Sequence, residues 1–279
     1  MLLAVLSGWG AGCSGVFARP GTVSLSFGGH AQGSLLSGFE LPVEGPGYAV
    51  PEAWRRRRAL YATEQLGGAL LRALALVERL HPGAVAPLGD LSRRGGGKAP
   101  GHASHRSGRD VDIFFYTVDG QGRPLPPGRA MLKFGRTGRA IAWSPALGER
   151  RPSGPVPEAY FDGVRTWALL RALFTDPAIQ VQWVFMQRDL ARAVLAQASR
   201  EGDAPDLLAR AEALLRQPGD SAPHDDHMHV RVYCDPAERT FGCADQGPVR
   251  WLKKHWKYLP AGTGPLVPEV PLASAAPLR

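Results

Sequence analysis

The residues best suited to chemistry fall in two short histidine-rich segments, residues 102–115 and 224–232. Together the segments hold five of the eight histidines of the chain, and Asp112 stands inside an apolar run of the first one. Imidazole nitrogens and carboxylate oxygens are usual ligands of catalytic zinc, which keeps one position open beside three protein ligands. The two segments therefore predict a metal site with an open position for chemistry.

The second segment has the pattern of a β-strand. Polar and apolar residues alternate over residues 227–232, so that His227, His229 and Arg231 share one face. The alternate residues are all apolar and form the opposite face, which is typical of a half-buried strand. This pattern places two imidazoles side by side, and it leaves open which of them would bind the metal.

The first segment predicts a strand around Asp112, because residues 111–115 are otherwise β-branched or aromatic. A buried carboxylate is costly unless a cation or a hydrogen-bond donor meets it, and a metal ion does so directly. Gly108 supplies a turn before this strand. We therefore expect His105 and Asp112 to fold back and face a common point.

Each feature also has a simpler explanation when it is taken alone. A His-x-His pair is often a surface pair, and an aspartate in a strand is often an edge residue or a cap. His102 and His224 could be ordinary loop residues. The metal-site hypothesis depends on the coincidence of the two dense groups, since few histidines occur elsewhere in the chain.

The two motifs together resemble those of a known family. A His-x6-Asp motif followed much later by His-x-His resembles the LAS group of zinc peptidases, which includes D-alanyl-D-alanine metallopeptidases and the hedgehog-type domain. Over about residues 20–255, the fuller pattern is similar to the penicillin-insensitive murein endopeptidase family. This pattern comprises Ser104-His105-x-x-Gly108-x-x-Val111-Asp112-Ile113, then His224-Asp-x-His227-x-His229-Val-Arg231, and upstream Ser26-Phe-Gly28, Gly33-x-Leu35, Gly38, Leu41-Pro42 and Gly45-x-Gly47-Tyr48-x-Val50.

The resemblance implies one zinc ion per chain, with His105, Asp112 and His229 as its ligands. It implies that His227 is the catalytic base or stabilises the oxyanion of the reaction. It also implies a supporting catalytic role for His224. These assignments come from the resemblance, because the strand pattern does not distinguish His227 from His229.

Three further residues are implied to surround the same site and contact the substrate or the ligands: His102, Ser104 and Arg231. A bound zinc lowers the pKa of its water toward about 7 and polarises the scissile carbonyl. An imidazole with a pKa near the working pH can take and return the proton. The sequence contains no His-Glu-x-x-His motif, which favours a histidine over a glutamate as the base.

The substrate that the resemblance implies is peptidoglycan, cut at the amide crosslink between D-alanine and diaminopimelate. One alternative is a zinc D-Ala-D-Ala carboxypeptidase or another cell-wall amidase with the same site. A second alternative is a catalytically inactive module that binds peptidoglycan. The presence of His227 and of all three implied ligands argues against this inactive module.

Composition agrees with an exported protein. The 279 residues suffice for one substantial domain, and 44% hydrophobic residues can form a packed core. No apolar run approaches the roughly 18 to 20 residues that span a bilayer. The net charge of +8 suits anionic partners such as the cell wall. The run Arg55–Arg58 lacks interleaved aromatic residues, so we expect no nucleic-acid partner.

The cysteines indicate the cellular compartment in which the protein works. Cys234 and Cys243 follow the His-x-His strand closely, and a disulfide between them would need an oxidising compartment, whereas two free thiols are the alternative. Cys13 follows an apolar start and small residues, as in a lipoprotein signal, although the basic N-terminal region is missing. We expect an exported, periplasmic protein that is held at a membrane only if Cys13 is lipidated.

The rest of the chain predicts an α+β fold, with a small antiparallel sheet that carries the metal site and is flanked by helices. Apolar periodicity predicts helices over residues 58–80, 164–174, 190–198 and 207–215, and alternation predicts a strand over 179–185. Residues 1–19 form a possible signal or lipoprotein segment, 20–258 a single peptidase domain, and 259–279 a disordered tail rich in proline and alanine.

A glycine-rich loop over residues 92–100 precedes the first histidine segment. It lacks the residues of a phosphate-binding loop, because Ser92 and Ala99 replace the glycine and the hydroxyl side chain that such a loop requires. We expect this loop at the rim of the cleft, with Arg93, Arg94 and Lys98 available for substrate carboxylates.

Overall fold

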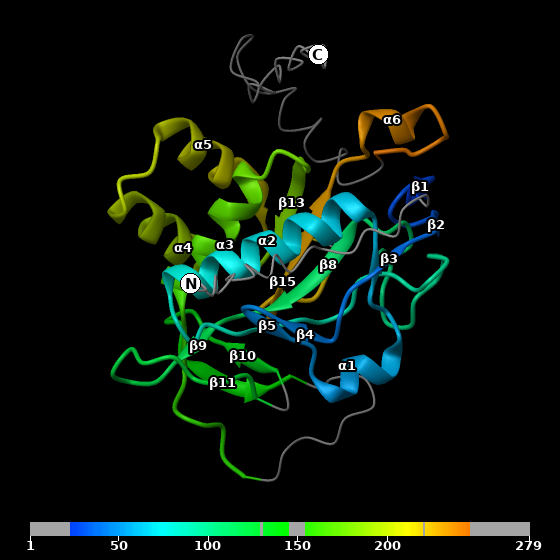
Figure 1. Ribbon diagram of the computed structural model, residues 1–279. Helices are drawn as coiled ribbons and strands as arrows, with labels where there is room; N and C mark the ends of the chain where they lie inside the picture. Colours follow the sequence, from blue (N-terminus) through cyan, green and yellow to red (C-terminus); the bar gives the residue numbers. More distant parts are fainter. Residues whose placement is uncertain (1–22, 129–130, 145–153, 220, 246–279) are drawn as a thin grey trace, which may run out of the picture.

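The computed structural model describes residues 23–128, 131–144, 154–219 and 221–245. At its centre lies a sheet with the strand order β14-β13-β15-β8 (Figure 1). Strand β15 pairs antiparallel with both β8 and β13, whereas β13 and β14 are parallel. The predicted α+β class is confirmed, with one parallel pair at the edge of an otherwise antiparallel sheet. The strands are β8 (Asp110–Phe114), β13 (Val181–Phe185), β14 (Leu215–Arg216) and β15 (His227–Val232).

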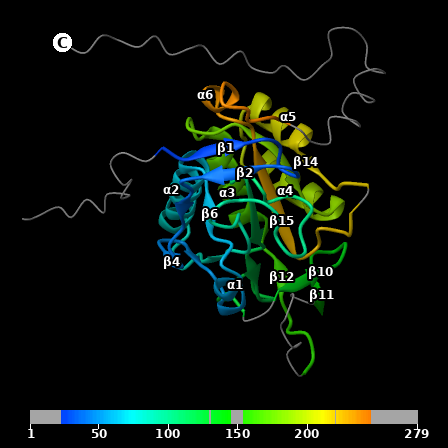
Figure 2. The same ribbon diagram turned by 90° about the vertical axis from the view of Figure 1, so that its right-hand side faces the viewer.

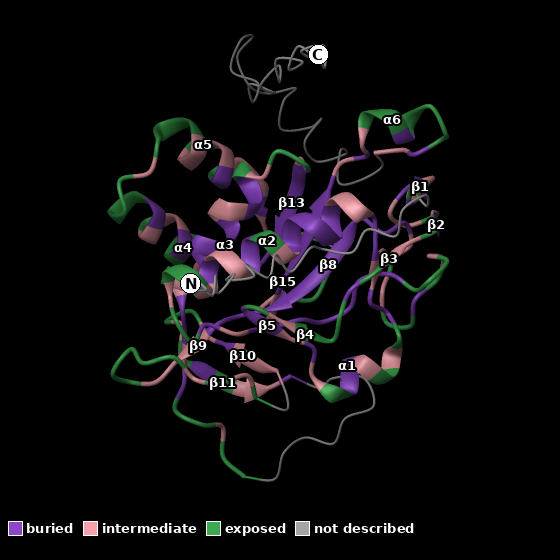
Figure 3. Ribbon diagram, in the orientation of Figure 1, coloured by how far each residue is buried: buried purple, intermediate pink, exposed green. Residues whose placement is uncertain are grey.

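Four helices carry much of the core on one side of this sheet. They are α2 (Glu64–Leu80), α3 (Gly163–Thr175), α4 (Arg188–Arg200) and α5 (Pro205–Leu214). In Figure 3 the central strands β8, β13 and β15 are buried, and the helices are buried on their inner sides. Leu66, Leu70 and Leu74 of α2 are fully buried, each contributing about 1.5–3 kcal/mol of hydrophobic stabilisation. The apolar residues of β8 and β15 belong to the same core, so the polar residues of both strands face the other way.

The helix predicted over residues 58–80 begins later than expected. Arg58 has a left-handed backbone and ends the separate short helix α1 (Glu52–Arg57). Residues Tyr61–Ala62 then form strand β6, which pairs with β3 (Phe39–Glu40). Helix α2 starts only after Thr63, whose hydroxyl accepts a hydrogen bond from the backbone N–H of Leu66. Apolar periodicity alone could not locate this start, because the break depends on the pairing of β6 with β3.

The other predicted elements are confirmed with slightly different limits. The helices predicted over 164–174, 190–198 and 207–215 correspond to α3, α4 and α5, and the strand predicted over 179–185 corresponds to β13. Strand β15 has the predicted alternation and lies between two neighbours. Its histidine-bearing face is also largely buried.

Smaller sheets surround the central one. In Figure 2, strands β1 and β2 lie near the short helix α6 (Pro236–Arg239) at one end, and β10 and β11 lie at the opposite end. The pairs are β1 (Leu25–Phe27) with β2 (Ser34–Leu36), β9 (Thr117–Val118) with β12 (Tyr160–Phe161), and β10 (Leu132–Phe134) with β11 (Ala140–Trp143). Strands β4 (Glu44–Gly45), β5 (Tyr48–Ala49) and β7 (Ala86–Pro87) form a three-stranded sheet.

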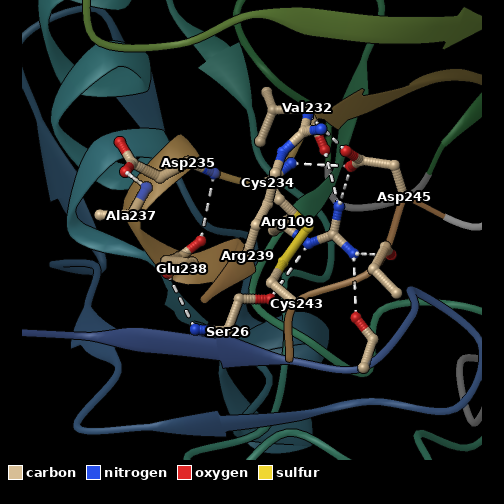
Figure 4. Close-up of a disulfide and its surroundings, with 12 residues drawn as sticks. Ser26, Arg109, Val232, Cys234, Asp235, Ala237, Glu238, Arg239, Cys243 and Asp245 are labelled. Carbon is tan, nitrogen blue, oxygen red and sulfur yellow. Dashed lines mark hydrogen bonds and ion pairs between the residues drawn. A yellow bond between two sulfur atoms is a disulfide. The ribbon is translucent and has the colours of Figure 1, made fainter. Parts of the chain in front are cut away.

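A buried arginine beside the disulfide joins the N-terminal hairpin to the central sheet (Figure 4). The predicted disulfide between Cys234 and Cys243 is present. Next to it, Arg109 is 1% exposed and meets five acceptors, which together with it form what we call the Arg109 cluster. The acceptors are the Ser26 hydroxyl and Asp245 carboxylate, at 3.0 and 3.1 Å, and the carbonyls of Gly28, Val232 and Ala244, at 3.3, 3.3 and 3.0 Å.

Some predictions lie outside the described residues. These are the signal segment 1–19 with Cys13, the tail 259–279, and the domain limits at residues 20 and 258. Among the residues that the structure describes, no helix has the length and apolar character needed to cross a membrane.

Candidate metal centre

The register of the central sheet brings the two histidine segments together. His229 of β15 is paired with Asp112 of β8, and Arg231 is paired with Asp110. Paired residues on neighbouring strands project from the same face of a sheet. The carboxylates and the histidines therefore meet on the face opposite the apolar core, where Asp112, His227 and His229 form the floor of a cleft.

His105 reaches this floor from the loop before β8. Its φ of 62° is left-handed, which costs a non-glycine residue about 1 kcal/mol or more. The predicted turn at Gly108 is present, and glycine is required there because its φ is 78°. An added Cβ would also lie 2.7 Å from a methyl group of Leu35. The His105 ring is completely buried, and its Nδ1 is 3.0 Å from the Leu91 carbonyl.

Three possible ligand atoms form a compact triangle on the floor, which we call the donor triangle. Nε2 of His105 is 3.2 Å from Nδ1 of His229 and 3.2 Å from Oδ1 of Asp112. Nδ1 of His229 is 3.1 Å from the same Asp112 oxygen. Zinc–nitrogen distances of 2.0–2.1 Å in a tetrahedral site require ligand atoms about 3.3 Å apart. The spacing of the triangle therefore fits a tetrahedral metal ion.

Hydrogen bonds on the outer side of each ring leave lone pairs inside the triangle. Nδ1 of His105 can only donate to the Leu91 carbonyl, so Nε2 of the neutral ring has no proton. Nε2 of His229 is 2.8 Å from an Asp110 oxygen and donates to it, so Nδ1 has no proton either. Oδ1 of Asp112 is buried and has no hydrogen-bond partner among the described residues. Three acceptors converge with no donor between them, and a cation would satisfy all three.

A second set of possible ligands overlaps the first. His102, His105 and Asp112 offer ligand atoms that lie within 4.8 Å of one another. His102 is more distant from Asp112, since its Nδ1 lies 3.8 Å from Oδ2, and its Nε2 is 2.7 Å from Oδ2 of Asp90. Asp90 also pairs with Arg57 at 2.6 Å. The three atoms of the donor triangle lie closer together than those of this second set.

His227 lies beside the triangle and is oriented by a carboxylate. Its Nδ1 is hydrogen-bonded to Asp226, and its Nε2 is 3.7 Å from Oδ1 of Asp112. Asp226 also accepts a hydrogen bond from the Ser144 hydroxyl and lies 3.7 Å from the Lys133 ammonium. Burial lowers the pKa of His227, but the carboxylates of Asp112 and Asp226 outweigh burial and raise it above its ordinary value.

His224 adjoins His227 but is in a different electrostatic state. The two ring centroids are 5.2 Å apart. Burial, followed by the neighbouring His227 and His229, lowers the pKa of His224 to about 4. His224 is therefore neutral near pH 7, and with so low a pKa it is a weak base, which suits a hydrogen-bonding or packing role.

Arg231 acts on the triangle through Asp110. Its Nε donates to Oδ1 of Asp110 at 2.7 Å, and the same oxygen receives the hydrogen bond from His229. Burial alone would raise the pKa of Asp110, but Arg231 and His229 hold it well below its usual range. The ionised carboxylate fixes the proton of His229 on Nε2 and so directs Nδ1 to the triangle.

The sequence analysis missed two carboxylates that orient the histidines. Asp110 precedes Asp112 by two residues in the same strand, so the alternation rule could have placed both on one face. Asp226 directly precedes His227, and no sequence pattern marks it as the partner of that ring. Of the residues predicted to surround the site, His102, Ser104 and Arg231 all line the cleft.

The cleft has a volume of about 1520 Å³ and continues past the donor triangle to α4 and β14. Its described lining does not include Arg93, Arg94 or Lys98, and their availability for substrate carboxylates at the rim of the cleft stays a prediction. The cations that do line it come from other elements: Lys133, Arg188, Arg192, Arg216 and Arg231. Gly96 of the glycine-rich loop instead packs against the β1–β2 hairpin, where it bridges to Ser34.

Two imidazoles and a carboxylate form a buried triangle at one end of an open cleft, and a histidine–aspartate pair lies beside them. This arrangement is typical of metal-dependent hydrolases. Comparison with known proteins shows which of them the chain resembles. The model of a family described as penicillin-insensitive murein endopeptidase matches residues 26–126, which include His105 and Asp112. His229 lies beyond this match.

Individual relatives carry the same name. A penicillin-insensitive murein endopeptidase of Citrobacter koseri is 29% identical over 231 residues, which cover 81% of this chain and 72% of the relative. Proteins of this name from Yersinia pestis and Yersinia pseudotuberculosis are 36% identical over 90 residues, which cover 32% of this chain and 32% of each relative. The predicted resemblance is confirmed: the chain is similar to proteins named penicillin-insensitive murein endopeptidases, which are peptidases.

Proposed function

We propose that this chain is a zinc-dependent murein endopeptidase that hydrolyses the D-alanyl-diaminopimelate crosslinks of peptidoglycan. The observation that carries the proposal is the donor triangle, in which three acceptor atoms lie 3.1–3.2 Å apart on the floor of an open cleft. We assign His105, Asp112 and His229 as the zinc ligands. The names of the relatives support peptidoglycan as the substrate.

The chemistry follows from the groups around the triangle. When bound, zinc supplies a Lewis acid that polarises the scissile carbonyl and lowers the pKa of a water toward about 7. His227 presents Nε2 toward the triangle and there takes a proton from the attacking water. Asp226 holds the opposite nitrogen of the ring and stabilises the imidazolium that forms. His227 then returns the proton to the leaving amine.

The remaining residues position this pair and the ligands. Arg231 and Asp110 hold His229 in the tautomer that a metal ligand needs. His224 stays neutral beside His227 and limits the positive charge near the base. The cleft extends beyond the donor triangle, which suits an internal peptide bond better than the chain end that a carboxypeptidase requires.

A periplasmic or otherwise exported location belongs to the same proposal. Peptidoglycan lies outside the cytoplasm, and the disulfide between Cys234 and Cys243 needs an oxidising compartment. The net charge of +8 favours association with an anionic wall.

The test is digestion of purified crosslinked muropeptide dimers by the full chain, with and without a chelator. We expect dimers to become monomers, and we expect the reaction to stop with the chelator and in His229→Ala and His227→Ala. Zinc content should fall in His229→Ala but stay near one per chain in His227→Ala. His81→Ala serves as the matched control, because His81 ends α2 and does not line the cleft.

Other outcomes distinguish the alternatives. Release of a terminal D-alanine without cleavage of dimers would indicate a D-Ala-D-Ala carboxypeptidase. Dimers that remain intact at one zinc per chain, together with tight binding to sacculi, would indicate an inactive peptidoglycan-binding module.

A further inference from the structure

The cleft has a second charged region, about two strands away from the donor triangle. Its wall is formed by the start of α4 and by β14, and three arginines line it: Arg188, Arg192 and Arg216. We call these three residues the arginine wall. Glu212 is the acidic residue that lines the same part of the cleft, so positive charge is in excess there. Neither the proposed metal chemistry nor the proposed base uses these arginines.

The sheet register connects this wall to the donor triangle. Phe185 of β13 is paired with His229 on one side and with Arg216 on the other. His229 is in turn paired with Asp112, so four residues form one row across the sheet and project from the same face. Neighbouring strands are 4.7–4.9 Å apart, which places the backbone of Arg216 about 10 Å from that of His229. This distance corresponds to about three residues of an extended peptide.

The middle of the row is aromatic. The ring of Phe185 lies 5.4 Å from the His229 ring, and the Arg231 guanidinium lies 5.4 Å from the Phe185 ring. Phe185 therefore separates the metal-ligand end of the row from its cationic end. A peptide that crosses it meets an apolar surface between two polar ends.

The arginines differ in how far they are already engaged. Arg192 is paired with Asp189 at 3.0 Å. Arg188 is exposed and makes no ion pair or hydrogen bond with the residues that the structure describes. Arg216 is half-buried and also interacts with other parts of the protein; burial lowers its pKa, while Glu212 acts in the opposite direction. A partly desolvated guanidinium binds a carboxylate more strongly than one in bulk water, and its planar fork can hold both oxygens.

We propose that Arg216, assisted by Arg188, forms a subsite that binds a free carboxylate of the substrate within about three residues of the scissile amide. This inference rests on the proposed function, because it names the anionic group that the same cleft recognises. A crosslinked stem peptide has two sources of such a carboxylate, its chain end and the second carboxyl group of diaminopimelate. Both present the same oxygens to a guanidinium.

The test compares Arg216→Gln and Arg188→Gln with the wild type on three dimers. One dimer has all carboxylates free, the second is amidated at the chain end, and the third is amidated at diaminopimelate. For the free dimer we expect Arg216→Gln to lower kcat/KM about 10- to 100-fold, mainly through KM, with zinc content unchanged. Arg188→Gln should have a smaller effect in the same direction. Arg216→Lys should recover part of the loss, because it restores the charge without the fork.

Amidation identifies which carboxylate is bound. The dimer amidated at the correct position should be a poorer substrate for the wild type, and Arg216→Gln should reduce its turnover no further. Arg79→Gln is the matched control, since Arg79 lies in the last turn of α2 and does not line the cleft. Equal losses on all three dimers, or no loss on any, would overturn the subsite. A loss of activity that is confined to intact sacculi would also overturn it, because the arginine wall would then bind an anionic polymer of the sacculus.

Failure of the proposed function gives a different pattern. If the wild type cleaves no dimer, the endopeptidase proposal fails, and binding of the same three dimers is then measured by calorimetry. A subsite predicts that the wild type binds the free dimer about 10-fold or more tighter than Arg216→Gln does. Equal affinities of the two proteins for the free dimer would overturn the subsite as well.

Discussion

The Arg109 cluster and the donor triangle are both buried and polar, but their hydrogen bonding is opposite. Arg109 offers donors to five acceptors from three segments of the chain. The donor triangle brings three acceptors together with no donor between them. A satisfied cluster stabilises the fold by itself, whereas converging unsatisfied acceptors are stable only when the rest of the fold holds them in place. The difference separates a structural cluster from a binding site.

The largest effect expected from this comparison is on activity. Asp112→Asn should lower kcat/KM for dimer hydrolysis by about 10³-fold or more, because a neutral amide is a poor metal ligand. The thermal stability of the metal-free protein should stay the same or rise, since the amide can donate to a facing imidazole. The measurements are dimer turnover, zinc content and metal-free Tm. A metal-free Tm that falls by many degrees would contradict the contrast, because the triangle would then be stabilising the fold.

The reverse pattern is expected for the Arg109 cluster. Arg109→Met should lower the free energy of unfolding by about 3–5 kcal/mol, because it removes the buried guanidinium that pairs with Asp245 and donates to four other acceptors. Chemical denaturation with and without zinc measures the loss. Arg123→Met is the matched control, since Arg123 pairs with Asp119 at the surface and should matter by less than about 1 kcal/mol. A stable Arg109→Met variant with reduced zinc affinity would show that the two regions are coupled.

A smaller effect is expected from the disulfide next to the Arg109 cluster. Replacing both Cys234 and Cys243 with serine should lower the free energy of unfolding by about 2–3 kcal/mol, the chain-entropy value for a short loop. Once the variant is folded and zinc-loaded, its turnover should match that of the wild type. The measurement is denaturation of the wild type under oxidising and reducing conditions beside the double variant. Loss of turnover in a folded variant would refute the division between structural and functional regions.

The smallest effect concerns pH. The pKa of His224 is about 4 in the folded protein, compared with 6.5 in the unfolded chain. Between these values the unfolded chain binds a proton that the folded protein excludes, so stability falls as the pH is lowered from 6.5 to 4. The metal-free protein should lose on the order of 1 kcal/mol at pH 5 through this group. Urea denaturation at pH 7 and pH 5 should show a smaller loss in His224→Gln, and an identical loss in both proteins would contradict the assignment.

Local sequence patterns predicted the structure well wherever the feature depends on a single strand or helix. The alternation over residues 227–232 correctly placed His229 and Arg231 on one face of β15. Periodicity located most of the helices, and cysteine spacing gave the disulfide. Prediction failed where distant segments decide the outcome. Helix α2 begins only after strand β6, whose pairing with β3 the apolar periodicity did not show.

By itself, the sequence determined which chemical groups are present and which of them share a strand face, because side-chain type and the two-residue period of a strand are local properties. Only the tertiary structure decided which nitrogens converge. The pairing of Asp112 with His229, the left-handed backbone of His105 and the bridging role of Asp110 depend on β8 and β15 meeting in one register. That register is set by burial of the whole apolar face of the sheet, to which residues far apart in the chain contribute together.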